Sequence, residues 1–158
     1  QILADDTEVG VTIMLLDEEM DHGPIVAQRT VKIPDWPPKA LALEERLAKD
    51  GGVLLAEVLP KWAAGELTTH AQDHGRATFT KKIVKEDGLL DLSDDPRRNI
   101  LKIRAFDPWP GTYFFVERDG KKIRVKITDA KLSDGNLEIV RVIPEGKREM
   151  SYEDFMRG

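Results

Sequence analysis

The sequence has no cysteine, no long apolar run and no secretory signal pattern, and each absence excludes a class of protein. Without thiols there is neither a disulfide framework nor a cysteine nucleophile. No apolar stretch approaches the roughly 20 residues that span a bilayer. A glycine-rich phosphate loop, a serine-nucleophile motif and a metal-ligand cluster are also missing. We therefore expect a cytoplasmic globular protein that holds no metal.

The 158 residues suffice for one ordinary domain or two small ones. A hydrophobic fraction of 41% can form a core, and a charged fraction of 34% indicates a well-solvated surface. Residues 1–75 carry 6 Lys/Arg and 14 Asp/Glu, whereas residues 76–158 carry 18 and 15. An acidic half followed by a mildly basic half indicates two domains with different partners. The basic excess is too small to indicate a nucleic-acid-binding protein by itself.

The first thirty-three residues predict a β-hairpin with an acidic loop. Residues 9–15 and 25–33 are dense in Val, Ile and Thr, and Asp, Gly and Pro punctuate the loop between them. Four carboxylates repel one another in this loop, at Asp17, Glu18, Glu19 and Asp21. A plain turn would avoid that repulsion, so we infer that one of them has a task. Because no Met and no earlier element precede these strands, we expect further structure on their N-terminal side.

A helix and a linker follow the hairpin. From about Lys39 to Trp62, apolar residues recur at spacings of three and four, which predicts a helix. Gly51-Gly52 predicts a kink or a break between two helices, and Gly65 is a suitable C-cap. Residues 67–78 show no apolar periodicity and are interpreted as a linker. Two histidines four residues apart in it, His70 and His74, would share one face of a helix as metal ligands, but a solvated linker explains the segment better.

The second half combines helix caps with hairpin signals. Asp94-Asp95-Pro96 is typical of a helix start, and the helix should end near Phe106. Three strand-like runs follow, at residues 112–118, 121–130 and 137–143. Asp119-Gly120 predicts a tight hairpin turn, and residues 133–136 predict another. Ser151 with Asp154 forms a capping box that predicts a short C-terminal helix.

Four segments resemble the signatures of a known family. Residues 8–14 (EVGVTIM) and 20–25 (MDHGPI) resemble the segment that follows the catalytic histidine region in 10-formyltetrahydrofolate-dependent formyltransferases. Residues 104–113 (RAFDPWPGTY) and 146–155 (GKREMSYEDF) resemble two signatures of the methionyl-tRNA formyltransferases within that family. The segments occur in the family's order over nearly the whole chain.

The resemblance implies an α/β fold in three parts. Residues 1–66 would be the C-terminal part of a Rossmann-like catalytic domain, residues 67–78 a linker, and residues 79–158 an OB-like, tRNA-binding domain. The first half of the catalytic domain would then be absent from this sequence. Only three strands are evident where an OB barrel has five, so the last domain is an abbreviated barrel or an open sheet.

The resemblance also implies a reaction. A formyl group would pass from 10-formyltetrahydrofolate, a cosubstrate, to the amino group of initiator methionyl-tRNA, a step of one-carbon metabolism that serves translation initiation. The attacking amine must lose a proton, and a tetrahedral oxyanion must be stabilised. In the family an Asn and a His do this, assisted by an Asp that polarises the His or a bound water. By its place in the motif, that residue is Asp21.

The loop residues have alternative interpretations. Asp21 is also typical of a turn, in which its side chain bonds its own backbone. The family geometry implies that the pterin pocket is lined by backbone groups of Glu18, Glu19, Met20 and Asp21. His22 should point away from Asp21, since adjacent residues on an extended segment face opposite sides. We expect His22 to be exposed and not catalytic.

The second half supplies candidates for tRNA contacts. Nine basic residues could neutralise phosphates: Lys81, Lys82, Lys85, Arg97, Arg98, Arg118, Lys121, Lys122 and Arg124. Each by itself is explained as a solvated surface charge, whereas together they favour a weak, salt-sensitive RNA surface on a monomer. Two alternatives remain. One is a sugar-nucleotide formyltransferase, against which residues 146–154 argue, and the other is a non-catalytic RNA-binding module.

Overall fold

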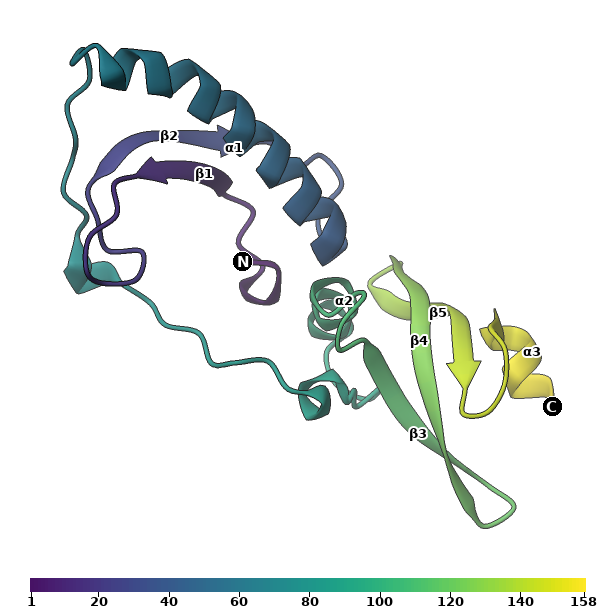
Figure 1. Cartoon of the computed structure of the whole chain (residues 1–158). Helices are drawn as coiled ribbons and strands as arrows, with labels where there is room; N and C mark the ends of the chain where they lie inside the picture. Colours follow the sequence, from purple (N-terminus) through teal and green to yellow (C-terminus); the bar gives the residue numbers. More distant parts are fainter. The chain divides into compact units, whose positions relative to one another are not determined.

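A computed structural model describes all of residues 1–158 (Figure 1). The chain forms two compact units. The hairpin–helix unit contains Glu8–Pro34 and Ala42–Lys81, and the sheet unit contains Gln1–Thr7, Asp35–Leu41 and Lys82–Gly158. No helix combines the length and the apolar character that a membrane crossing requires.

The hairpin–helix unit is built on the predicted hairpin. Strands β1 (Val9–Met14) and β2 (Ile25–Val31) pair antiparallel, with Val9 opposite Val31. Helix α1 (Ala40–Ala63) runs along the hairpin in Figure 1. Its buried Leu54 and Val58 form a small core with Val26 of β2. The helix thus covers the apolar face that the two strands could not bury by themselves.

Helix α1 continues through Gly51-Gly52, so the predicted break between two helices is wrong. Each interior glycine costs a helix about 1 kcal/mol relative to alanine. Burial of the apolar side chains on both sides of the pair offsets this cost. A Cβ on Gly51 would lie 3.7 Å from Val11 Cγ1, so the helix passes close to β1 at this point. The predicted C-cap is confirmed, because Gly65 has φ +74° and the Glu66 amide donates to the Lys61 carbonyl.

The sheet unit contains four antiparallel strands in the order β3-β4-β5-β6. They are β3 (Thr112–Arg118), β4 (Lys121–Ser133), β5 (Asn136–Pro144) and β6 (Met150–Ser151). Both predicted turns are confirmed: Asp119-Gly120 and Asp134-Gly135 have positive φ at both positions, as tight hairpin turns require. Strand β4 extends beyond the predicted Ala130, and the two-residue β6 had no sequence signal.

Two helices flank this sheet, and both caps agree with the sequence. Asp95 caps α2 (Pro96–Ala105) by accepting from the Arg98 amide at 2.8 Å. Ser151 caps α3 (Tyr152–Arg157) by accepting from the Asp154 amide at 3.1 Å. The core joins α2, the sheet and α3 through residues such as Ile100, Val125, Val142 and Phe155. Three short 3-10 helices lie at Ile2–Ala4, His74–Arg76 and Lys85–Gly88.

The expectation of a mixed α/β protein is confirmed, with helices and antiparallel strands in both units. In the sheet unit, β3 and β6 are the outermost strands, and no pairing is recorded between them. The four strands therefore do not close on themselves as a barrel does. The outer edge of β3 is covered at one point, where the Leu90 amide donates to the Tyr113 carbonyl at 2.8 Å.

Candidate functional site

The loop between β1 and β2 is shaped by its backbone. The Leu15 amide donates to the Pro24 carbonyl at 3.0 Å and closes the base of the loop. Gly23 is buried at this base, and a Cβ there would lie 1.8 Å from the Leu15 carbonyl oxygen. No other residue fits at position 23 without displacing the backbone. The glycine of the motif is therefore required by the geometry of the loop.

Asp21 lies near the tip of this loop with an exposed side chain. Its φ is +55°, a left-handed conformation that Asp tolerates better than most residues. Its carboxylate has no hydrogen-bond or ion-pair partner in the structure, in contrast to that of Asp17. In particular, the carboxylate does not form the hydrogen bond to its own backbone that the turn-forming interpretation requires. The carboxylate is free to accept a hydrogen bond from an incoming group.

Gln72 holds the backbone of this loop from a distant part of the sequence. Its Nε2 donates to the carbonyl of Asp21 at 2.8 Å and to the carbonyl of Gly23 at 2.7 Å. These two bonds clamp the backbone on both sides of His22. Sequence reasoning missed this role, because a single amide in a polar segment carries no signal of its partner.

His22 is partly exposed and makes two contacts that the sequence did not predict. Its Nδ1 lies 2.7 Å from Asp17 Oδ2, and its ring stacks on His74 with 3.7 Å between centroids. The hydrogen bond to the carboxylate raises the pKa of His22 above its ordinary value. The same bond lowers the pKa of Asp17. Asp17 and His22 thus stabilise the loop as a pair and leave Asp21 unpaired.

The segment after α1 is largely exposed, as expected for a linker, but it is attached to the hairpin. The backbones of His70 and Ile25 exchange two hydrogen bonds of 2.8 Å. His74 contributes its ring to the stack with His22, and no cluster of three or more potential metal ligands exists in the chain. The contribution of this segment is to position the acidic loop.

The nine basic candidates lie in the sheet unit and at its boundary, in different environments. Arg97 forms two hydrogen bonds to Asp5, at 2.6 and 2.9 Å, and lowers the pKa of that carboxyl group. Arg118 lies over the Phe155 ring and donates to the Phe155 carbonyl. These two side chains already hold parts of the sheet unit together, which argues against a direct role in RNA binding.

The other seven candidates fall into three groups. Arg98 makes only a 3.5 Å ion pair with Asp94, which lies just before the N-cap of the same helix. Three side chains occupy the exposed β3–β4 hairpin, namely Lys121, Lys122 and Arg124. Three others precede α2 in the sequence: Lys81 and Lys82 lie in an irregular segment, and Lys85 begins the 3-10 helix Lys85–Gly88. The structure does not gather the nine into one patch.

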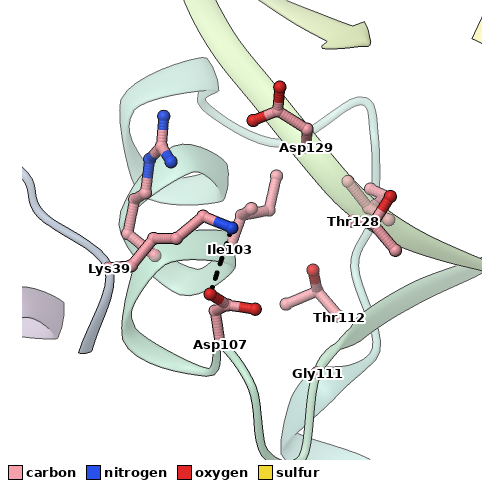
Figure 2. Close-up of a pocket in the computed structure, with 9 residues that line it drawn as sticks. Lys39, Ile103, Asp107, Gly111, Thr112, Thr128 and Asp129 are labelled. Carbon is pink, nitrogen blue, oxygen red and sulfur yellow. Dashed lines mark ion pairs between the residues drawn. The ribbon is translucent and has the colours of Figure 1, made fainter. Parts of the chain in front are cut away.

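A small polar pocket lies at the end of α2 (Figure 2). Lys39 Nζ pairs with Asp107 Oδ2 at 3.2 Å on one side of it. Thr112, only 2% exposed, has a hydroxyl with no hydrogen-bond partner. The pocket has room for about one water molecule, which could satisfy that hydroxyl. It is too small for a substrate, so we assign it a structural role.

Comparisons with known proteins agree with this arrangement. The formyl transferase family model matches residues 1–59, and the model of the formyl transferase C-terminal domain matches residues 82–134. The methionyl-tRNA formyltransferase of Chloroflexus aurantiacus is 39% identical over 182 residues, covering 99% of this chain and 57% of that protein. The chain belongs to the formyl transferase family.

Solved structures show the same fold. The methionyl-tRNA formyltransferase from Clostridium thermocellum aligns over 87% of this chain and 56% of its own, with a TM-score of 0.60 and 18% identity. HypX from Aquifex aeolicus, in complex with tetrahydrofolic acid, aligns over 98% of this chain and 31% of its own, with a TM-score of 0.65 and 18% identity. This chain spans little more than half the length of the curated relative described above.

Proposed function

We propose that this chain serves the transfer of a formyl group from 10-formyltetrahydrofolate to the amino group of methionyl-tRNA. The observation that carries the proposal is the unpaired carboxylate of Asp21, held at the tip of a loop in a chain of this family. The sequence relative from Chloroflexus aurantiacus, which bears the name of this activity, supports the tRNA acceptor. The assignment of 10-formyltetrahydrofolate as the formyl donor rests on the chain's membership of the family.

In this proposal Asp21 is a hydrogen-bond acceptor. Its carboxylate orients and polarises a histidine or a bound water, which then takes the proton of the attacking amine. Donors to the developing oxyanion come from an Asn and a His. Because the relatives are almost twice as long as this chain, we place the Asn and the His in the part of those enzymes that these residues do not match.

The backbone of the acidic loop has the second role in the proposal. Peptide groups of Glu18, Glu19, Met20 and Asp21 line the pterin site. The Met20 side chain, 92% exposed, is available to contact a bound ring. Gly23 and Gln72 fix this backbone, which reduces the conformational entropy that the loop would lose on binding.

The sheet unit has the tRNA role in the proposal. We treat it as an abbreviated, open OB-like sheet, whose exposed hairpin cations contact phosphates. Such contacts position the tRNA without reading its bases. Affinity should then fall as salt rises.

The experiment that tests the catalytic proposal is an Asp21→Asn substitution in the full-length enzyme. The amide keeps the size of the side chain but cannot accept a proton or stabilise an imidazolium. We expect kcat to fall about 10²- to 10⁴-fold, the range of general acid–base contributions. Glu66→Gln, which removes an exposed carboxylate of the same unit outside the loop, is the matched control and should leave kcat unchanged.

Initial rates with methionyl-tRNA and with an amino-sugar nucleotide as acceptors complete this test. An unchanged kcat in Asp21→Asn would return Asp21 to the turn-forming interpretation. Formylation of the sugar nucleotide but not of methionyl-tRNA would refute the proposed acceptor and leave the role of Asp21 intact.

A further inference from the structure

One face of the β3–β4 hairpin combines aromatic rings with cations. Side chains alternate along a strand, so Tyr113 and Phe115 of β3 share a face while their neighbours enter the core. The register places Lys126 opposite Tyr113 and Arg124 opposite Phe115, on the same face. We define the aromatic–cationic face as Tyr113, Phe115, Lys122, Arg124 and Lys126.

Two of the three cations of this face lie on its rings. The guanidinium carbon of Arg124 is 3.9 Å from the centroid of the Tyr113 ring. The Nζ of Lys122 is 4.3 Å from the centroid of Phe115. The two rings meet edge to face, with centroids 5.7 Å apart. Cation–π contacts therefore order four side chains into one layer.

No carboxylate neutralises the cations of this face. Elsewhere in the same sheet, Lys131 pairs with Glu138 at 3.1 Å and Arg141 pairs with Glu149 at 3.0 Å. Glu117, which faces Lys122 in the register, makes no ion pair with it. The positive charge of the face is thus available to an anion.

The face also exposes apolar surface beside a groove. Phe115 is 41% exposed, and an open groove next to it is lined by the apolar Leu89 and Leu92. Lys102 also lines this groove, as do two acidic residues, Asp91 and Asp94, neither of which forms an ion pair with a cation of the face. Exposed aromatic surface flanked by free cations is the combination that single-stranded nucleic acids bind, because a base stacks on a ring or a guanidinium while the phosphate meets a cation. An acidic peptide would use the cations but would leave the rings without a partner.

We propose that the aromatic–cationic face binds unpaired RNA nucleotides. A base stacks on the side of the Arg124 guanidinium that faces away from the Tyr113 ring. Phosphates lie at Lys122 and Lys126. The inference rests on the proposed tRNA function and deepens it, since it assigns this face to an unpaired stretch of the tRNA and not to a helical stem.

A preference for unpaired RNA separates this site from a purely electrostatic surface. Bases in a duplex are already stacked on their neighbours, whereas phosphates are accessible in both forms. Contacts to phosphates alone would bind a duplex at least as well. Stacking on the face requires bases whose planes are free.

The test measures fluorescence anisotropy of a labelled, unpaired RNA of about ten nucleotides, within the site sizes known for such surfaces, and of a duplex of the same length. The 158-residue chain is titrated at two salt concentrations. Tyr113→Leu/Phe115→Leu removes both rings but keeps apolar bulk. Phe79→Leu is the matched control, because Phe79 is a 95% exposed ring outside the face. Lys122→Gln/Arg124→Gln removes charge.

We expect the ring variant to weaken binding of the unpaired RNA at least about fivefold, which corresponds to the loss of one stacked base. Its salt dependence and its binding of the duplex should not change. The charge variant should reduce the salt dependence for both RNAs. Phe79→Leu should behave like the unsubstituted chain.

Three results would overturn the inference. They are equal binding of both RNAs by the unsubstituted chain, a ring variant that binds like Phe79→Leu, and a polyglutamate that competes as well as the unpaired RNA. Equal binding of both RNAs would leave the phosphate-contact proposal intact, and no RNA binding at all would refute both. Circular dichroism verifies folding, and Phe115→Leu alone replaces the double variant if that unfolds.

Discussion

At the scale of single residues, the position of Asp21 depends on backbone contacts made by others. Gly23 permits the close approach to Leu15, and Gln72 bonds the two carbonyls that flank His22. The Asp17–His22 pair holds the other side of the loop. The resemblance identified Asp21 as a candidate, but only the folded chain shows what fixes it in place.

Gln72→Glu in the full-length enzyme tests this positioning role. The substitution keeps the shape of the side chain but replaces the donor of both hydrogen bonds by a carboxylate, which repels the two carbonyls. Misplacement of a reacting group by about 1 Å can cost 10²-fold, so we expect kcat to fall about 10- to 100-fold. KM for methionyl-tRNA should change little, because the loop is not a proposed tRNA contact.

Gln28→Glu is the control for this substitution. Gln28 also donates through Nε2, to Thr12 on the neighbouring strand, and lies in the same unit. Equal losses of kcat in the two variants would show that Gln72 acts only through stability. Steady-state kinetics with thermal unfolding of each variant separates the two cases.

At the scale of elements, local signals determined where α2 and α3 begin, whereas packing determined that α1 is continuous. A cap depends on residues within four positions of each other, so Asp95 and Ser151 could be identified from the sequence. The Gly51-Gly52 pair is a local signal that favours an interruption of the helix. Burial of α1 side chains against the hairpin overrides this signal.

Asp95→Ala tests the contribution of a cap. Loss of the bond from the Arg98 amide should lower the free energy of unfolding of the sheet unit by about 0.5–2 kcal/mol. Asp94→Ala removes an exposed ion pair with Arg98 and an exposed hydrogen bond from the Asp95 amide, but it leaves the cap of α2 in place. It should therefore cost less than Asp95→Ala, since exposed i,i+4 ion pairs contribute about 0.3–0.5 kcal/mol. Urea denaturation measures both, and a larger loss in Asp94→Ala would contradict the capping assignment.

At the scale of the whole molecule, the chain offers no asparagine for the mechanism proposed above in the unit that contains Asp21. The chain has two asparagines, Asn99 and Asn136, and both lie in the sheet unit, whereas Asp21 lies in the hairpin–helix unit. Asn99 is buried and donates to the Asp91 carbonyl at 2.8 Å, so its amide is committed to the fold. No asparagine of the hairpin–helix unit is available to stabilise an oxyanion beside Asp21.

We therefore expect the 158-residue chain by itself not to catalyse formyl transfer. A formylation assay with purified chain, 10-formyltetrahydrofolate and methionyl-tRNA measures this directly. Turnover within the ordinary enzymatic range of about 1–10³ s⁻¹ would show that the groups present here suffice. The full-length enzyme, assayed in parallel, is the positive control.

The sequence by itself determined the features that depend on short separations. Both tight turns, both helix caps, the first hairpin and the location of the acidic loop follow from residues only a few positions apart. The family resemblance added Asp21 as the catalytic candidate and the division at residues 66 and 79, and both stay predictions.

Tertiary structure decided the features that join distant residues. The clamp of Gln72 on the Asp21 loop, the stack of His22 on His74 and the continuity of α1 all require contacts between segments far apart in the sequence. No periodicity or motif encodes such pairs, because a hydrogen bond or a buried contact depends on the distance between atoms in space. The free energy of packing selects these partners only once the strands and helices have come together.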